Sequence, residues 1–128
     1  MHAKLQGIGP ATVAGALYGV PDPQGWFPAL IAGAGVVHGW LYEAGPEFGE
    51  ADLAQLDAYE DFDPEHPERS LYIRDMIEAA GEDGTRCEAQ VYRFAQPLPE
   101  GSRAIPGGHF RAWLAEQGLG EFQGLREA

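Results

Sequence analysis

Alternation of apolar with polar or small residues is the commonest pattern along this chain of 128 residues. Successive side chains of a strand point to opposite faces of a sheet, so this alternation predicts β-strands. The predicted strands cover residues 11–20, 26–31, 36–43, 71–78 and 86–94. A glycine inside a strand often marks a distortion, so Gly15 predicts a bend or bulge in the first one.

Glycine and proline mark the predicted connections between these strands. Turns are expected at residues 21–25 and 32–35, and Gly81-Glu-Asp-Gly84 predicts a hairpin turn. Helical spacing of apolar residues occurs at 50–59, where acids occupy the first turn, and a second short helix is predicted at 110–116, ending near Gly118. The chain therefore predicts a single α+β domain, residues 1–128, built on a mostly antiparallel, curled sheet.

The net charge is −12, from 20 acids against 8 Lys plus Arg. This surface would repel phosphate backbones, so neither nucleic acid nor an anionic membrane is an expected partner. The acid excess is explained either by solubility or by attraction of an amine-bearing ligand. One cysteine, Cys87, excludes a disulfide within the chain, and no apolar run is long enough to span a membrane. We expect a soluble, cytoplasmic protein.

Most familiar active-site patterns are missing. The four histidines, at positions 2, 38, 66 and 109, lack zinc-ligand spacing, and the two serines, Ser70 and Ser102, lie outside any Gly-x-Ser-x-Gly turn. No Walker motif is present, and Gly33-Ala-Gly35 precedes a strand, whereas a dinucleotide loop follows one. Cys87 is either a small strand residue or a nucleophile.

Two carboxylates remain as candidates for proton transfer. Asp57 and Glu60 are three residues apart, so they are neighbours on one helical face, beside Tyr59 and Phe62. Close acids or partial burial can raise the pKa of a carboxyl group toward neutrality, which would suit Glu60 as a general base and acid. In the alternative interpretation, both are solvated acids at a helix end.

Six motifs follow one another in an order that resembles the gamma-glutamylcyclotransferase-like family, including its gamma-glutamylamine cyclotransferase and AIG2-like branches. The resemblance extends over roughly residues 9 to 114, and its specificity lies in the order and spacing of the motifs. The motifs are Gly15-Ala-Leu-Tyr18, Trp26-Phe-Pro-Ala-Leu30, Val37-His-Gly-Trp-Leu-Tyr42, Leu56-Asp-Ala-Tyr-Glu60, Tyr72-Ile-Arg74 and Ala89-Gln-Val-Tyr92.

The resemblance implies a small mixed β-barrel with short helices and a cofactor-free, metal-free reaction. A gamma-glutamyl compound would cyclise to 5-oxoproline and release an amine or amino acid, with Glu60 matching the catalytic acid of the family's Leu-Asp-x-x-Glu motif. Tyr92 matches a tyrosine near the family's cavity, and Trp26, Phe27 and Pro28 match a segment that borders it. For these four residues, core packing is an open alternative to substrate contact.

One departure from the family concerns its first strand. Members usually carry Tyr-Gly-Thr-Leu or Tyr-Gly-Ser-Leu there, in a loop whose backbone amides bind the substrate's carboxylate. This chain contains no such motif, since Tyr18-Gly19-Val20 belongs to a different strand. Either the sequence begins downstream of the full protein's start, or the protein lacks this loop. A missing strand would leave an unpaired sheet edge, which favours a homodimer.

The sequence thus supports two functions. The first is a cyclotransferase acting on a small gamma-glutamyl molecule. The second is a non-catalytic ligand-binding or interaction module on the same fold, which the missing loop favours. A structural domain that completes its sheet with a partner's strand is a weaker third possibility.

Overall fold

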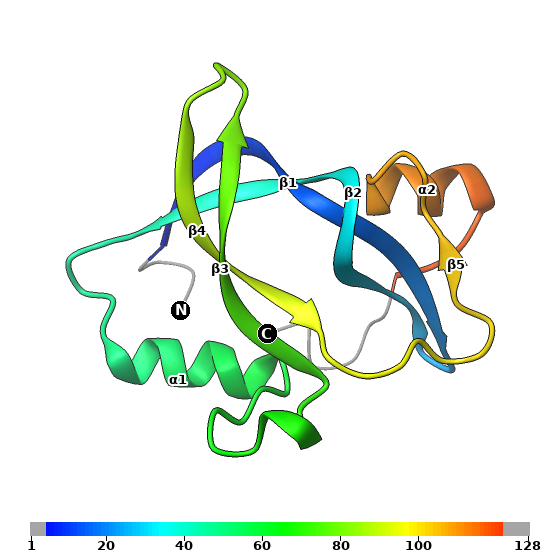
Figure 1. Ribbon diagram of the computed structural model, residues 1–128, viewed down its shortest axis with the longest axis horizontal. Coiled ribbons are helices and arrows are strands. Elements are labelled where there is room, and N and C mark those ends of the chain that lie inside the picture. Colours follow the sequence, from blue (N-terminus) through cyan, green and yellow to red (C-terminus); the bar gives the residue numbers. More distant parts are fainter. Residues whose placement is uncertain (1–4, 122–128) are drawn as a thin grey trace.

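Two long antiparallel strands form the frame of the computed structural model, which describes residues 5–121 (Figure 1). Helices α1 and α2 lie near opposite ends of the sheet (Figure 1). The predicted α+β class is confirmed. The elements are β1 (Leu5–Asp22), β2 (Gly25–Ala44), α1 (Glu50–Tyr59), the 3-10 helix η2 (Pro67–Arg69), β3 (Tyr72–Gly81), β4 (Arg86–Phe94), β5 (Arg103–Ala104) and α2 (Phe110–Gln117).

The hairpin of β1 and β2 differs from the prediction at one place. Residues 32–35 were expected to form a turn between two strands, and this prediction is wrong. Ala16 pairs with Ile31 while Gly15 pairs with Gly35, so residues 32–34 bulge out of one continuous strand. Continued pairing with β1 on both sides of the bulge keeps β2 extended, and the bulge at Gly15 itself was predicted correctly.

The sheet does not close among the described residues. Its strand order is β2-β1-β3-β4, with β5 also paired to β1, and all pairs are antiparallel. β1 pairs with β3 only through Ala11–Val13, and β2 and β4 approach each other without a ladder. The closed barrel implied by the family resemblance is therefore an open, curled sheet in the described part of the chain. Dimerisation through its edge stays a prediction.

Two apolar clusters hold the strands and helix α2 together. The first joins β1 and β2 to α2, whose Trp113 is buried against the sheet. The second lies where the start of β3 meets β2, and there the Tyr72 hydroxyl donates a hydrogen bond of 2.6 Å to the carbonyl of Pro28. The buried members of the clusters are Leu17, Leu30, Val37, Ile105, Trp113 and Leu114, then Val20, Ala29, Tyr72 and Phe94.

The approach of α2 to β2 depends on Gly108. This residue is buried, has a φ of 66°, and accepts a hydrogen bond of 2.7 Å from the backbone N–H of His38. A Cβ at this position would lie 1.9 Å from the carbonyl oxygen of Val36. Both the positive φ and the close approach therefore require glycine.

We expect Gly108→Ala to lower the free energy of unfolding by more than about 2 kcal/mol, because the left-handed conformation alone costs roughly 1–2 kcal/mol and the clash adds to it. Chemical denaturation measures the loss. Gly107→Ala is the matched control, since no atom lies within 4 Å of its added Cβ. Equal losses in the two variants would contradict this role for Gly108.

Candidate functional site

A cavity of about 880 Å³ lies between α1, the β3–β4 hairpin and the far ends of β1 and β2. Its walls are mostly apolar. Ile8, Trp40, Tyr42 and Met76 all line it and are each more than half exposed. A volume of this size is typical of small-molecule sites. The cavity is therefore the candidate functional site.

Helix α1 places Glu60 on the wall of this cavity. Leu53, Leu56 and Glu60 recur at helical spacing and all three line the cavity. Glu60 ends the helix, with its backbone N–H donating a hydrogen bond of 3.0 Å to the carbonyl of Leu56. Its side chain is half-buried, so the carboxylate can meet a ligand without full exposure to water.

Asp57 lies behind the cavity wall, where it is only 5% exposed. The Arg74 guanidinium donates two hydrogen bonds to its carboxylate, from Nε to Oδ1 at 2.8 Å and from Nη2 to Oδ2 at 3.2 Å. The Tyr92 hydroxyl donates a third, of 2.7 Å, to Oδ1. The interpretation of Asp57 as a solvated acid is therefore wrong: it joins α1 to β3 through Arg74 and to β4 through Tyr92.

The charges of this cluster alter the ionisation of its members. The hydrogen bond to Asp57 raises the pKa of the Arg74 guanidinium above its usual value, against the opposing effect of burial. Burial and the hydrogen bond to Asp57 raise the pKa of the Tyr92 phenol well above its usual value, and the charge of Glu60 adds to this. Arg74 thus stays cationic and Tyr92 stays a neutral phenol at physiological pH.

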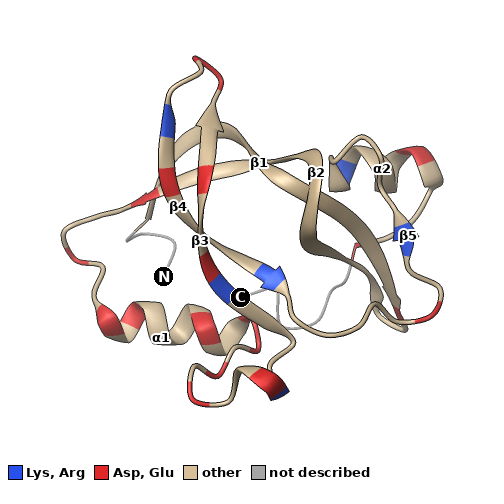
Figure 2. Cartoon of the chain, in the orientation of Figure 1, with Lys and Arg blue, Asp and Glu red and all other residues tan. Residues whose placement is uncertain are grey.

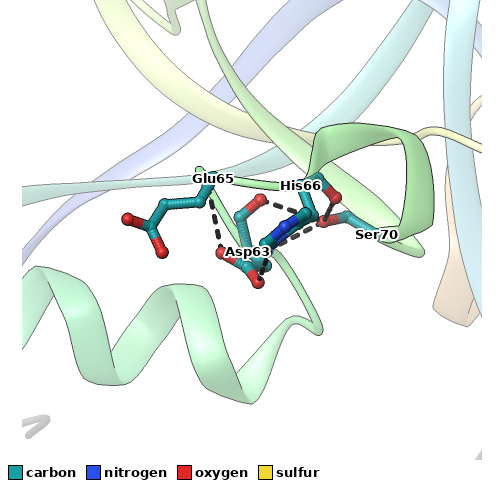
Figure 3. A network of polar contacts seen from close by, with 4 residues as sticks. All are labelled: Asp63, Glu65, His66 and Ser70. Atoms are coloured by element: carbon teal, nitrogen blue, oxygen red, sulfur yellow. Dashed lines mark hydrogen bonds and ion pairs between the residues drawn. The ribbon is translucent and has the colours of Figure 1, made fainter.

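The loop from 61 to 71 connects Glu60 to the strand that carries Arg74. Asp63 organises it through hydrogen bonds from the backbone N–H of Glu65 and from the His66 ring (Figure 3). The buried Ser70 hydroxyl accepts a bond of 2.8 Å from the N–H of Asp63. The ends of the loop meet through the N–H of Leu71 and the carbonyl of residue 61, at 3.0 Å. This closure holds the end of α1 against the start of β3.

The segment formed by α1 and the loop that follows it is acidic. Residues 50–68 contain acids and no Lys or Arg, and Figure 2 shows the acids along α1 and the loop that follows. Within the cavity wall, Glu43, Glu60 and Glu88 contribute carboxylates, while Arg74 is paired with Asp57. Such a wall favours a ligand that carries positive charge.

The remaining predicted site residues divide into two groups. Tyr92 and Pro28 line the cavity with Glu60, so these three border the same space. Trp26 and Phe27 lie outside the lining: Trp26 packs edge-on against Trp113 at 5.4 Å between ring centroids, and Phe27 packs near Phe94. A role for any of them in substrate binding stays a prediction.

Sequence reasoning did not assign a role to Arg74 or Gln90. Gln90 accepts a hydrogen bond from Arg74 Nη1 across the β3–β4 ladder, where the two residues are close neighbours. One signal was available, because Arg74 is a basic residue on a predicted strand of a strongly acidic chain. Its partner could not be read from the sequence, since 17 residues separate it from Asp57.

Other kinds of site find no support in the part of the chain that the structure describes. Within residues 5–121, no three His, Cys, Asp or Glu side chains gather as metal ligands. The same residues include no helix of the length and hydrophobicity needed to cross a membrane. Cys87 is exposed and lines the cavity, away from the Asp57 cluster.

Comparison with protein families gives a match over most of the chain. The family described as "Gamma-glutamyl cyclotransferase, AIG2-like" matches residues 1–112 of the chain. No curated protein and no solved structure matches it.

We expect Asp57→Ala to lower the free energy of unfolding by about 3 kcal/mol, because it leaves the partly buried Arg74 without its carboxylate. Glu78→Ala provides the control, since it breaks the ion pair with Arg86 in which both side chains are more than 60% exposed. That loss should stay below about 1 kcal/mol. Urea unfolding of both variants makes the comparison, and a similar loss in each would show that burial of the Asp57 pair is unimportant.

Ser70→Ala tests the closure of the loop. Removal of the buried hydroxyl leaves the N–H of Asp63 without its partner, which should cost roughly 1–3 kcal/mol of unfolding free energy. The other serine of the chain supplies the control, because the Ser102 hydroxyl donates to the nearby carbonyl of Pro99 in an exposed turn. In thermal unfolding, Ser70→Ala should have a lower Tm than Ser102→Ala. A lower Tm for Ser102→Ala would refute the role of the Ser70 hydroxyl in closing the loop.

Proposed function

Because the chain belongs to the AIG2-like gamma-glutamyl cyclotransferase family, we propose that it cyclises a gamma-glutamyl amine or peptide to 5-oxoproline. Membership supports a cyclotransferase-like activity in general. The substrate and the roles of individual residues are the finer part of the proposal. It rests on one observation: Glu60, which matches the family's catalytic position, lines a cavity large enough for a small molecule.

In the proposed reaction, the substrate's α-amine attacks its own γ-carbonyl carbon. A new C–N bond closes the five-membered lactam, and the original amide C–N bond breaks to release the amine. The α-ammonium loses two protons to become the lactam N–H, and the departing nitrogen gains two to leave as an ammonium, so protons balance. A single carboxylate can carry these protons in turn as general base and general acid.

The protein's contribution is to place and confine the reacting groups. Glu60 would accept the first proton, and the half-buried wall around it would keep the amine and carbonyl in contact. Pro28 and Tyr92 would bound the substrate beside Glu60, since both line the same cavity. The acidic wall would attract the substrate's ammonium group. None of these steps requires a metal or organic cofactor.

A ligand-binding or interaction module without turnover is the second candidate function. It is favoured by the absence of Tyr-Gly-Thr-Leu and Tyr-Gly-Ser-Leu from this chain. Without that loop, the family's backbone donors for the substrate's carboxylate have no counterpart that the sequence identifies. Such a module would bind gamma-glutamyl compounds or 5-oxoproline in the same cavity and leave them unchanged.

We expect the purified protein to release 5-oxoproline from at least one member of a panel of gamma-glutamyl amines and dipeptides. Glu60→Gln should lower kcat by roughly 10²–10⁴-fold, because it removes the proton-transferring group and keeps its shape. Chromatographic detection of 5-oxoproline measures the rates. Glu68→Gln is the matched control, since Glu68 is exposed and lies outside the cavity lining.

The same panel distinguishes the two functions. A bound ligand at 100 times its Kd stabilises the folded state by about 2.7 kcal/mol, which a thermal shift detects. Stabilisation without release of 5-oxoproline would support the binding module. Full activity of Glu60→Gln in an active enzyme would remove Glu60 from the mechanism.

A further inference from the structure

The hydrogen bond between Tyr92 and Asp57 has a direction that the surrounding groups determine. Asp57 receives two N–H bonds from Arg74, so its oxygens act as acceptors in an ion pair. Tyr92 Oη lies 2.7 Å from Oδ1, and the phenol must therefore supply the proton. Gln90 accepts from the same guanidinium and helps to hold Arg74 in place.

The hydrogen bond to Asp57 determines what the Tyr92 phenol can offer a ligand in the cavity. Tyr92 lines the cavity, whereas Asp57 is buried behind it and does not. With its proton committed to Asp57, the phenol oxygen has only lone pairs left to offer a ligand. The raised pKa of the phenol keeps it neutral, so this arrangement holds across the pH range of ordinary assays.

We propose that Asp57, held by Arg74, fixes Tyr92 as a hydrogen-bond acceptor that selects ligands carrying an amine N–H beside Glu60. The proposal rests on the proposed function, in which the ligand's α-ammonium is the group that meets Glu60. Tyr92 and Glu60 line the same cavity and would contact the ammonium from two elements, β4 and the end of α1. In this arrangement Tyr92 is a specificity-determining residue and Asp57 is a positioning residue.

The character of the cavity wall agrees with this assignment. Glu43, Glu60 and Glu88 contribute carboxylates to it, and Arg74 has its charge matched by Asp57. A phenol that donated to the ligand would instead favour a carbonyl or carboxylate oxygen. The two possibilities therefore predict opposite preferences for ligands with and without the amine.

Equilibrium binding of two probes tests the proposal independently of turnover. The first probe is S-propyl-L-homocysteine, which has the α-ammonium and α-carboxylate but no carbonyl at which to cyclise. The second is the same molecule without the α-amine. Calorimetry should show that the wild-type protein prefers the first probe, and that Tyr92→Phe loses roughly tenfold or more of this preference, as expected for a hydrogen bond to a charged group.

Two further variants separate specificity from structure. Tyr18→Phe removes a hydroxyl outside the cavity lining and should keep the full preference. Asp57→Ala should reduce the preference as Tyr92→Phe does, because it removes the carboxylate that accepts the phenol proton and leaves that proton free to turn toward the cavity. An equal loss of affinity for both probes in Tyr92→Phe, or an unchanged preference, would overturn the proposal.

A measurement on the wild-type protein covers the case in which Tyr92→Phe does not fold. A trimethylammonium form of the first probe keeps the positive charge and has no N–H to donate. It should bind roughly tenfold more weakly than the primary amine. Equal binding would refute an N–H acceptor at this site. Failure to release 5-oxoproline from any substrate would refute the proposed function alone, because no probe here requires turnover.

Discussion

The ion pair between Asp57 and Arg74 is the contact on which the site depends. It joins the last turn of α1 to β3, and the Tyr92 hydroxyl extends it to β4. Removing both charges from water is costly, and two hydrogen bonds in a fork geometry offset that cost. Because Glu60 follows Asp57 by less than one helical turn, the same pair determines where the candidate catalytic carboxylate lies.

The loop between these elements supports the same geometry by another route. Asp63 and Ser70 bond across it, and its two ends meet directly through backbone groups. Acidic and proline-rich sequence of this kind could have remained irregular and solvated. Local turns around Asp63 instead satisfy backbone polar groups of the loop. The connection between Glu60 and Arg74 is therefore closed.

The open sheet leaves space for the cavity. β1 pairs with β3 over three residues only, so the β3–β4 hairpin diverges from the long β1–β2 ribbon. The cavity occupies the space between them, and α1 borders it. An apolar wall with several carboxylates suits a small molecule that has an uncharged body and an amine. In the proposed site, Tyr92 would add a directional contact to this general charge preference.

Local signals in the sequence were enough for much of the fold. Acids in the first turn and apolar spacing predicted α1 at residues 50–59, and alternation after a glycine turn predicted β4 at 86–94, as the structure has them. These elements depend on neighbouring residues, which the sequence displays directly. The family resemblance likewise rests on ordered local motifs, and the match over residues 1–112 confirms the family.

Long-range packing decided the rest. Residues 32–35 were predicted to form a turn because small residues and glycine are typical of turns, but pairing with β1 on either side makes residues 32–34 a bulge. A solvated acid was one of the interpretations of Asp57 that the sequence left open, and β3 and β4 exclude it by placing Arg74 and Tyr92 against its carboxylate. A sequence pattern records which side chains are present. The burial of Asp57 and the direction of the hydrogen bond from Tyr92 depend on contacts that only the folded chain makes. Arg74 and Tyr92 lie 17 and 35 residues from Asp57 in the sequence.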